Sequence, residues 1–350
     1  MGQVTRCRGV GSVREMIRFI FSLVVAALVA CSCTTEEGAF EEEVLFRSGG
    51  VGVLETVTQF DPSQLETPES LDFDRSGNIY VSLALTGEIR KIEPDGTEST
   101  LVYIPIGTPL EQCHNYLAIM GALVVHHDEL FVTANACDLD SRGVWRVELD
   151  SGDASLVASA PATALLNGIT VRFNRLYMAD SGAGRIWTAP TDGEGAPMTV
   201  WATTPLLDPV PNPFGAPGAN GIQQHLNEFL IANSSAQTIV AIPTHGGHAG
   251  TPYVKYQSPP GCDDFAVDVL GRIYCTTDPF QTVMRINTDG SIQTLFGAAD
   301  GLDGPTSARF GKFDDVRTVY VTNAAFPFFP STGNGPSVQK FEVDLPGYPL

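Results

Sequence analysis

The stretch Gly77-Asn-Ile-Tyr-Val-Ser82 decides the fold, because close variants of it recur along the 350-residue chain. Each copy is a strand-like run rich in branched and aromatic residues. The six copies are Gly77-Asn-Ile-Tyr-Val-Ser82, Asp128-Glu-Leu-Phe-Val-Thr133, Asn174-Arg-Leu-Tyr-Met-Ala179, Asn227-Glu-Phe-Leu-Ile-Ala232, Gly271-Arg-Ile-Tyr-Cys-Thr276 and Arg317-Thr-Val-Tyr-Val-Thr322. Their third residues lie 51, 46, 53, 44 and 46 residues apart. A near-constant period of this size is typical of a propeller or a solenoid array.

Each repeat contains four short strand patterns. In the first repeat, residues 69–74, 79–83, 87–92 and 97–103 are expected to form successive antiparallel strands. Asp-Gly pairs such as Asp95-Gly96 supply the positive φ that a tight hairpin needs. Long helical periodicity is missing, and 35 Gly and 24 Pro residues interrupt the short runs. The sequence therefore predicts an all-β fold, a six-bladed β-propeller of four-stranded antiparallel blades.

The last repeat lacks an outer strand of its own. Its three strands are expected near residues 307–311, 318–323 and 337–343, close to the end of the chain. Residues 52–60, ahead of the first complete repeat, look like the outer strands of the other copies. We expect this N-terminal strand to close the ring and to cover an open sheet edge, so that the propeller spans residues 52–350.

The N-terminus has the pattern of a secretory signal, predicted over residues 1–30. Four Arg residues precede the apolar run 19–30, which is too short to span a membrane as a stable helix. Leu28-Val-Ala-Cys31 resembles the lipobox of bacterial lipoproteins. That resemblance implies lipidation of Cys31 and anchoring at the cell envelope, on the outer membrane or the periplasmic face. An ordinary signal peptide with a chance Cys is the alternative. Met16 is a second candidate start, and residues 31–51 are expected to form an acidic tether.

The overall charge restricts the classes of partner. The chain carries 40 acidic and 20 basic residues, a formal net charge of −20. Phosphate backbones and anionic bilayer surfaces repel such a protein, so the sequence argues against a nucleic-acid partner. We expect a monomer that attracts cations.

Four cysteines fall inside the predicted ring, an even number in an oxidising compartment. Cys113 and Cys137 bracket one predicted hairpin, and Cys262 and Cys275 bracket another. We therefore expect the disulfides Cys113–Cys137 and Cys262–Cys275. The alternative is free buried thiols, which behave as small apolar side chains.

Aligning the repeats reveals oxygen-bearing side chains at one equivalent position, the head of the inner strand. Successive repeats have Glu69, Gly121, Asn167, Asn220, Asp263 and then Thr306 or Ser307 there. Inner strands converge on the propeller axis, so these heads meet at one end of the central channel. Glu69, Asn167, Asn220 and Asp263 form a hard-oxygen set suited to Ca²⁺, with Mg²⁺, Mn²⁺ or Zn²⁺ as alternatives. A structural reading stays open, because Asn-Gly is also a common turn dipeptide.

The order of these four residues resembles the senescence-marker-protein/gluconolactonase/paraoxonase-like propellers. The resemblance implies a divalent-metal-dependent hydrolase of lactones or related esters, with a small lactone or ester as its substrate. Two features depart from the family pattern. Glu69 follows Pro68 where the family often has Glu-Gly-Pro, and Asp263 has a second acid beside it, Asp264. We choose Asp263 because its spacing to Asp268 matches that of Glu69 to Asp74.

As a hydrolase, the protein is expected to use Asp263 as the general base that activates water. No Gly-x-Ser-x-Gly motif is placed for serine hydrolysis. The alternative function is a non-catalytic propeller that binds a ligand or partner and uses the metal as a structural clip. Segments 202–219 and 326–336 are expected to cover the metal face. The residues that end the second strands are expected to cap loops or to line the substrate mouth: Asn135, Asp180, Asn233, Asp278 and Asn323.

Overall fold

The computed structural model describes residues 50–114, 116–212 and 217–349. The predicted signal peptide and Cys31 lie outside these residues. Within the described part, no helix is long and apolar enough to cross a membrane.

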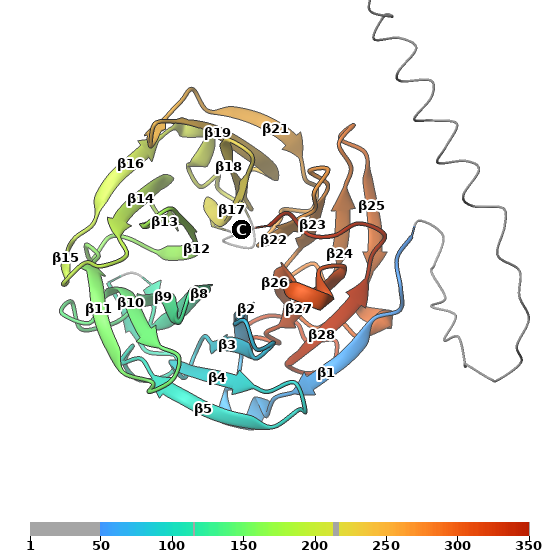
Figure 1. Cartoon of the computed structure of the whole chain (residues 1–350), viewed down its shortest axis with the longest axis horizontal. Helices are drawn as coiled ribbons and strands as arrows, with labels where there is room; N and C mark the ends of the chain where they lie inside the picture. Colours follow the sequence, from blue (N-terminus) through green and yellow to red (C-terminus); the bar gives the residue numbers. More distant parts are fainter. Residues whose placement is uncertain (1–49, 115, 213–216, 350) are drawn as a thin grey trace, which may run out of the picture. The chain divides into compact units, whose positions relative to one another are not determined.

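Six antiparallel sheets are arranged around a central channel, which confirms the predicted six-bladed propeller (Figure 1). Blade one contains β2 (Pro68–Phe73), β3 (Ile79–Leu83), β4 (Glu88–Ile92) and β5 (Glu98–Tyr103). Blade two contains β8 (Ile119–His126), β9 (Glu129–Asn135), β10 (Gly143–Glu148) and β11 (Ala154–Ser159). Blade three contains β12 (Leu166–Arg172), β13 (Arg175–Asp180), β14 (Arg185–Pro190) and β16 (Thr199–Thr203).

The remaining three blades follow the same order. Blade four contains β17 (Ala219–His225), β18 (Glu228–Asn233), β19 (Thr238–His245) and β21 (Tyr253–Gln257). Blade five contains β22 (Phe265–Val267), β23 (Ile273–Thr276), β24 (Val283–Ile286) and β25 (Ile292–Phe296). Blade six contains β26 (Pro305–Phe310), β27 (Thr318–Asn323), β28 (Ser337–Glu342) and, from the N-terminus, β1 (Glu55–Gln59).

Two blades depart from the predicted four strands. In blade two, the short strand β15 (Ala196–Pro197) pairs in parallel with β11. In blade four, β20 (His248–Ala249) pairs with the extended end of β19. A separate small hairpin joins β6 (Gln112–Cys113) and β7 (Tyr116–Leu117). Single 3-10 turns are η1 (Pro62–Gln64), η2 (Pro205–Leu207), η3 (Ala298–Asp300) and η4 (Phe313–Asp315).

The N-terminal strand closes the ring, as the sequence predicts. β1 pairs antiparallel with β28, from Glu55 opposite Lys340 to Gln59 opposite Ser337. This pairing covers the edge that β28 would otherwise expose. On the other side of blade six, Tyr320 packs edge-on against Phe73 of blade one, with ring centroids 4.8 Å apart. The joint between the last and first blades is therefore packed with apolar side chains like the other blade interfaces.

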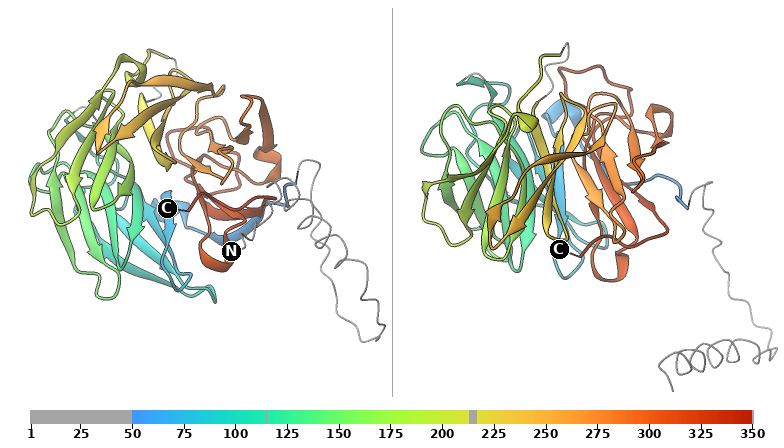
Figure 2. Two further views of the ribbon diagram at one scale, coloured as in Figure 1. Left: turned by 45° about the horizontal axis from the view of Figure 1, so that its top comes forward. Right: turned by 90° about the horizontal axis from the view of Figure 1, so that it is seen from above.

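The ring has two opposite faces, which we call the pocket face and the turn face. The right panel of Figure 2 shows the ring edge-on. The pocket face holds the starts of the inner strands β2, β8, β12, β17 and β26, and the residues just before β22. The turn face holds the turns between first and second strands, at residues 74–78, 127–128, 173–174, 226–227, 268–272 and 311–317. Antiparallel pairing puts these turns at the opposite end of every blade from the strand starts.

Both predicted disulfides are present. Cys113 bonds to Cys137, and Cys262 bonds to Cys275. The first joins the β6–β7 hairpin to the loop after β9. The second joins the segment before β22 to β23, directly beside Asp263.

Candidate metal centre

A β-bulge turns the head residue of most inner strands toward the axis. The ladder between first and second strands shifts register between Pro68 and Ser70, which leaves Glu69 unpaired. Similar shifts span Asn167 in blade three and Asn220 in blade four. A bulge re-aims one side chain without ending the strand, and here it does so at equivalent places. In blade six the shift spans Thr306, which resolves the uncertain alignment of that repeat.

A belt of hydroxyl groups holds the bulges in position. Thr133 donates to the carbonyl of Asn167 at 2.9 Å, and Thr322 donates to that of Glu69 at 3.2 Å. Ser82 and Thr276 make the same contact with Gly121 and Thr306. These donors are the last residues of the quoted repeats, so each blade fixes the bulge of the next. In blades three and four that position is Ala. There Ser181 and Ser234, two residues further on, donate to the carbonyls of Ala219 and Cys262, which directly precede Asn220 and Asp263.

The structure brings all four predicted ligands to one cavity. Glu69, Asn167, Asn220 and Asp263 line a 480 Å³ pocket at the pocket face. Asn220 donates from Nδ2 to Ser234 Oγ at 3.0 Å and also to the carboxylate of Asp263. Its amide oxygen is thereby left available to a ligand. Asp264 does not line this pocket, because its Oδ2 binds Arg309 at 2.7 Å and Ser307 at 2.7 Å.

A third acid that the metal prediction omitted, Asp278, lines the same pocket. Asp278 follows β23, and the sequence left two roles open for it: capping a loop or lining the substrate mouth. Asn135 also lines the pocket, and its amide is occupied by the backbone N–H and carbonyl of Leu166. The equivalent residues of other blades cap loops instead: Asp180, Asn233 and Asn323.

The electrostatics of the pocket favour binding of a cation. Burial and the charges of Asp278 and Asp264 raise the pKa of Glu69 to about 8. Burial, followed by the charges of Glu69, Asp278 and Asp264, raises the pKa of Asp263 well above its usual range. Burial and the charge of Asp303 raise that of Asp278 to about 7. Crowded carboxylates of this kind repel one another unless protons or a cation neutralise them.

Unpartnered oxygens point to the same conclusion. Oε2 of Glu69 and Oδ1 of Asp278 are enclosed and have no hydrogen-bond partner among the described residues. A buried carboxylate oxygen without a donor is costly, and a divalent cation would satisfy it. Two carboxylates and two amide carbonyls are also the donor types that Ca²⁺ prefers. The donor types present therefore suit such an ion, while the carboxylate oxygens of Glu69, Asp263 and Asp278 do not all lie within 4.8 Å of one another.

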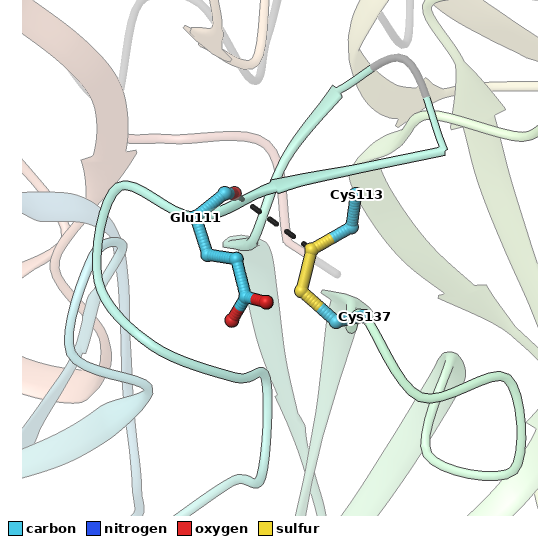
Figure 3. A group of neighbouring side chains, drawn as sticks. All are labelled: Glu111, Cys113 and Cys137. Atoms are coloured by element: carbon cyan, nitrogen blue, oxygen red, sulfur yellow. Dashed lines mark hydrogen bonds between the residues drawn. A yellow bond between two sulfur atoms is a disulfide. The ribbon is translucent and has the colours of Figure 1, made fainter.

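A second group of metal-type side chains does not form a metal site. Glu111, Cys113 and Cys137 bring their ligand atoms within 4.8 Å of one another, but both sulfur atoms are used in the disulfide (Figure 3). The Sγ of Cys113 also lies 3.7 Å from the Glu111 carbonyl oxygen. This cluster fixes a loop, and that loop carries Tyr116 and Leu117 into the pocket wall.

Apolar side chains cover the candidate centre. The predicted covering segments contribute Pro209 and Pro217, and the three aromatic residues Phe326, Phe328 and Phe329. Phe328 stacks on Phe326 with ring centroids 4.9 Å apart. The buried carboxylate of Asp303 holds the end of this aromatic loop, accepting from Ser331 Oγ at 2.7 Å and from the N–H of Thr332 at 3.0 Å. The contribution of the β6–β7 hairpin was not predicted, since its short strands have no repeat signature.

Comparisons with solved structures show a shared fold. A calcium-binding regucalcin from Agrobacterium tumefaciens is 16% identical, with a TM-score of 0.61, over 85% of this chain and 94% of that one. A gluconolactonase from Xanthomonas campestris is 15% identical, with a TM-score of 0.59, over 85% and 90%. An aldose sugar dehydrogenase from Streptomyces coelicolor, solved with pyrroloquinoline quinone, is 13% identical, with a TM-score of 0.58, over 85% and 99%.

These neighbours carry out different chemistry, so the likeness is evidence for the architecture alone. No protein-family model and no curated protein matches the sequence.

Proposed function

We propose that this propeller is a divalent-metal-dependent hydrolase of lactones or related esters, anchored at the cell envelope through Cys31. The observation that carries the proposal is the meeting of Glu69, Asn167, Asn220 and Asp263 in one pocket, with enclosed carboxylate oxygens that lack donors. The likeness in fold to a regucalcin and a gluconolactonase is consistent with it.

The four ligands would hold Ca²⁺, with Mg²⁺, Mn²⁺ or Zn²⁺ as alternatives. When bound, such an ion supplies Lewis acidity toward a carbonyl oxygen and stabilises developing negative charge. The chain itself supplies orientation. Asn220 fixes the Asp263 carboxylate by a hydrogen bond, and Ser234 fixes the Asn220 amide at 3.0 Å.

A proton acceptor is also needed, and the pocket contains a separate candidate for that role. Asp263 was expected to act both as ligand and as general base, although a carboxylate on a dication has little basicity left. Asp278 lines the same pocket and has one unpartnered oxygen. We therefore assign Asp263 as a ligand of the cation and Asp278 as the general base that accepts a proton from water. Asp263 remains the alternative general base.

The pocket wall favours a substrate with an apolar substituent. Leu117, Ile119, Leu165 and the three Phe residues of the covering loop offer no hydrogen bonds to sugar hydroxyl groups. An alkyl or aryl group would bury apolar surface against them. We expect alkyl lactones and aryl esters to be better substrates than a polyhydroxylated lactone.

The test is hydrolysis by purified residues 34–350 of alkyl lactones, aryl esters and gluconolactone, followed by acid release with and without Ca²⁺. Glu69→Gln should abolish metal-dependent turnover, and Glu55→Gln, on the exposed strand β1, should retain it. Absence of metal-dependent turnover on every substrate would refute the hydrolase proposal.

A structural clip is the second candidate, favoured by the hydrogen bonds that link Asn220, Ser234 and Asp263 across blades four and five. Under that proposal Ca²⁺ raises the melting temperature and Glu69→Gln removes the effect, while no substrate is turned over.

A further inference from the structure

The turn face carries large apolar side chains that are exposed to solvent. Phe173 is 81% exposed, Leu270 63%, Leu226 61% and Phe313 56%. Each lies in the turn between the first and second strands of one blade, in blades three to six. We call these four residues the tip residues. Apolar groups gathered on one face of a strongly acidic protein indicate an interaction surface.

Three tip residues have a left-handed backbone conformation, which is unfavourable for large apolar residues. Phe173, Leu226 and Phe313 have φ of 54°, 54° and 59°. This left-handed region is disfavoured for residues with a Cβ, and tight hairpins usually have Asn, Asp or Gly there. At these exposures the three side chains add little to the core. Their positions therefore favour a role at the surface.

The tip residues of neighbouring blades lie close together. Arg172 donates to the carbonyl of Leu226 at 3.4 Å, which joins the turns of blades three and four. Phe173 and Phe313 line one 480 Å³ hollow at the mouth of the channel. In blades four and five, Gly271 lies against the ring of His225. The turns that carry the tip residues are therefore neighbours, and charged side chains such as Arg172 and Lys312 line the hollow between Phe173 and Phe313.

The chain reaches the ring at this same face. Val51 pairs with Val343, directly after Glu342, and Glu342 lies opposite Thr318 at the end of the turn 311–317. Cys31, the lipidation site that the sequence predicts, is thus connected to the ring on the turn face through residues 32–49. A lipid attached at Cys31 would hold the turn face near a bilayer.

We propose that the tip residues insert into the surface of a zwitterionic lipid bilayer, so that the turn face rests on the membrane and the pocket face opens to solvent. The exposed turns between third and fourth strands lie on the same face and carry acids, including Asp95, Asp150, Asp192 and Asp289. Basic side chains such as Arg75 and Lys312 lie nearer the channel on this face. The formal net charge of −20 for the whole chain disfavours anionic lipid, and the acids of the outer turns would oppose a second copy of the chain docked face to face. The inference does not depend on the proposed activity.

The test uses the full chain reconstituted in phosphatidylcholine vesicles that contain a doxyl-labelled lipid, which quenches nearby tryptophan. Phe173→Trp places a probe at the tips, and Phe328→Trp places a matched probe on the pocket face, where Phe328 is also exposed. The unsubstituted chain gives the background of its three native Trp residues. We expect strong quenching of the probe at 173 and little at 328. Equal quenching of both probes, or of neither, would overturn the proposal.

A second variant tests the patch itself. Leu226→Asp with Phe313→Asp, in the Phe173→Trp background, should lower the quenching at 173 to the level of the control probe, because each charge opposes insertion. Circular dichroism and the melting curve check that the ring still folds. If the probe at 173 is unquenched and sedimentation finds a dimer that Leu226→Asp dissociates, the face binds a second copy and the membrane proposal is wrong.

Discussion

Asp264 and Arg309 form a buried ion pair, with 2.7 Å between Oδ2 and Nη1, while the preceding residue Asp263 lines the pocket. The two adjacent acids lie in a bend just before β22, and this bend gives their side chains different environments. Asp264 already has a cationic partner inside the protein. Asp263 has the amide of Asn220 and no cationic partner among the described residues.

Breaking this ion pair should destabilise the ring. Arg309→Leu leaves the Asp264 charge buried without its partner, at a cost of about 3–5 kcal/mol in the free energy of unfolding. The double variant Asp264→Leu with Arg309→Leu should recover most of that loss. Urea unfolding measures both. Lys255→Met is the control, because it removes a partly exposed partner of Glu228 and should cost about 1 kcal/mol or less. A single variant as stable as the double would contradict the assignment.

The metal-free chain should lose stability as the pH rises through neutrality. The folded-state pKa of Glu69 is raised from 4.5 to about 8, and that of Asp278 from 3.8 to about 7. A raised acid pKa means that the folded state binds the proton more tightly than the unfolded state. The stabilisation is therefore complete below the unfolded pKa and is lost as the pH rises through the folded pKa.

Chemical unfolding between pH 4 and 9, in chelator, measures this loss. Other carboxylates also contribute, so the informative quantity is the difference between the wild type and Asp278→Asn. As the pH rises, the free energy of unfolding of the wild type should fall relative to that of Asp278→Asn. A difference that is constant with pH would show that Asp278 is not perturbed by folding.

Calcium should stabilise the wild-type chain and not the ligand variant. An ion that binds only the folded state at 100 times its dissociation constant adds about 2.7 kcal/mol. Glu69→Gln should reduce this gain. Above pH 8, where Glu69 of the metal-free chain is ionised, the variant should also be more stable than the metal-free wild type, because one of the repelling charges is gone. Thermal melting with Ca²⁺ and with chelator tests both effects, with Glu55→Gln as the exposed control. Equal responses of the two variants to Ca²⁺ would rule out Glu69 as a ligand.

The two disulfides should have different effects. Cys262–Cys275 spans 13 residues inside blade five, and its removal should cost about 3 kcal/mol by the loop-entropy estimate. Cys113–Cys137 fixes the hairpin that carries Tyr116, so its removal should also increase hydrogen exchange in residues 107–118. Paired Cys→Ala variants, followed by unfolding and hydrogen exchange, separate the two roles. If removal of either disulfide increased hydrogen exchange only in blade five, the two disulfides would not have the separate roles proposed here.

The ring was predictable from the residues because propeller repeats are local. Each strand pattern, such as Ile79–Leu83 or Thr318–Asn323, lies within one blade, and the structure has both at the predicted bounds. The outer strand of blade six and both disulfide pairings were also predicted, since an incomplete repeat and bracketed hairpins are visible in the sequence. The fifth strands of blades two and four were not, because they depend on how loops pack against an existing edge.

The residues of the candidate centre were visible only as an alignment of chemically suitable side chains. Their convergence depends on bulges at Glu69, Asn167 and Asn220, and on hydroxyl groups from neighbouring blades such as Thr133 and Thr322. The belt of Ser and Thr was present in the sequence, at the end of the quoted repeats, but its meaning requires knowing which blade follows which in space.

Three features depended on folding. Asp278 joins the pocket while Asp180, Asn233 and Asn323 cap loops, a difference set by the neighbouring backbone and not by residue type. The β6–β7 hairpin becomes part of the pocket wall because a disulfide holds it there. The turns that carry the tip residues become neighbours because closing the ring brings together segments that are distant in the sequence. Local pattern therefore determined the blades, and the closed ring decided which side chains meet.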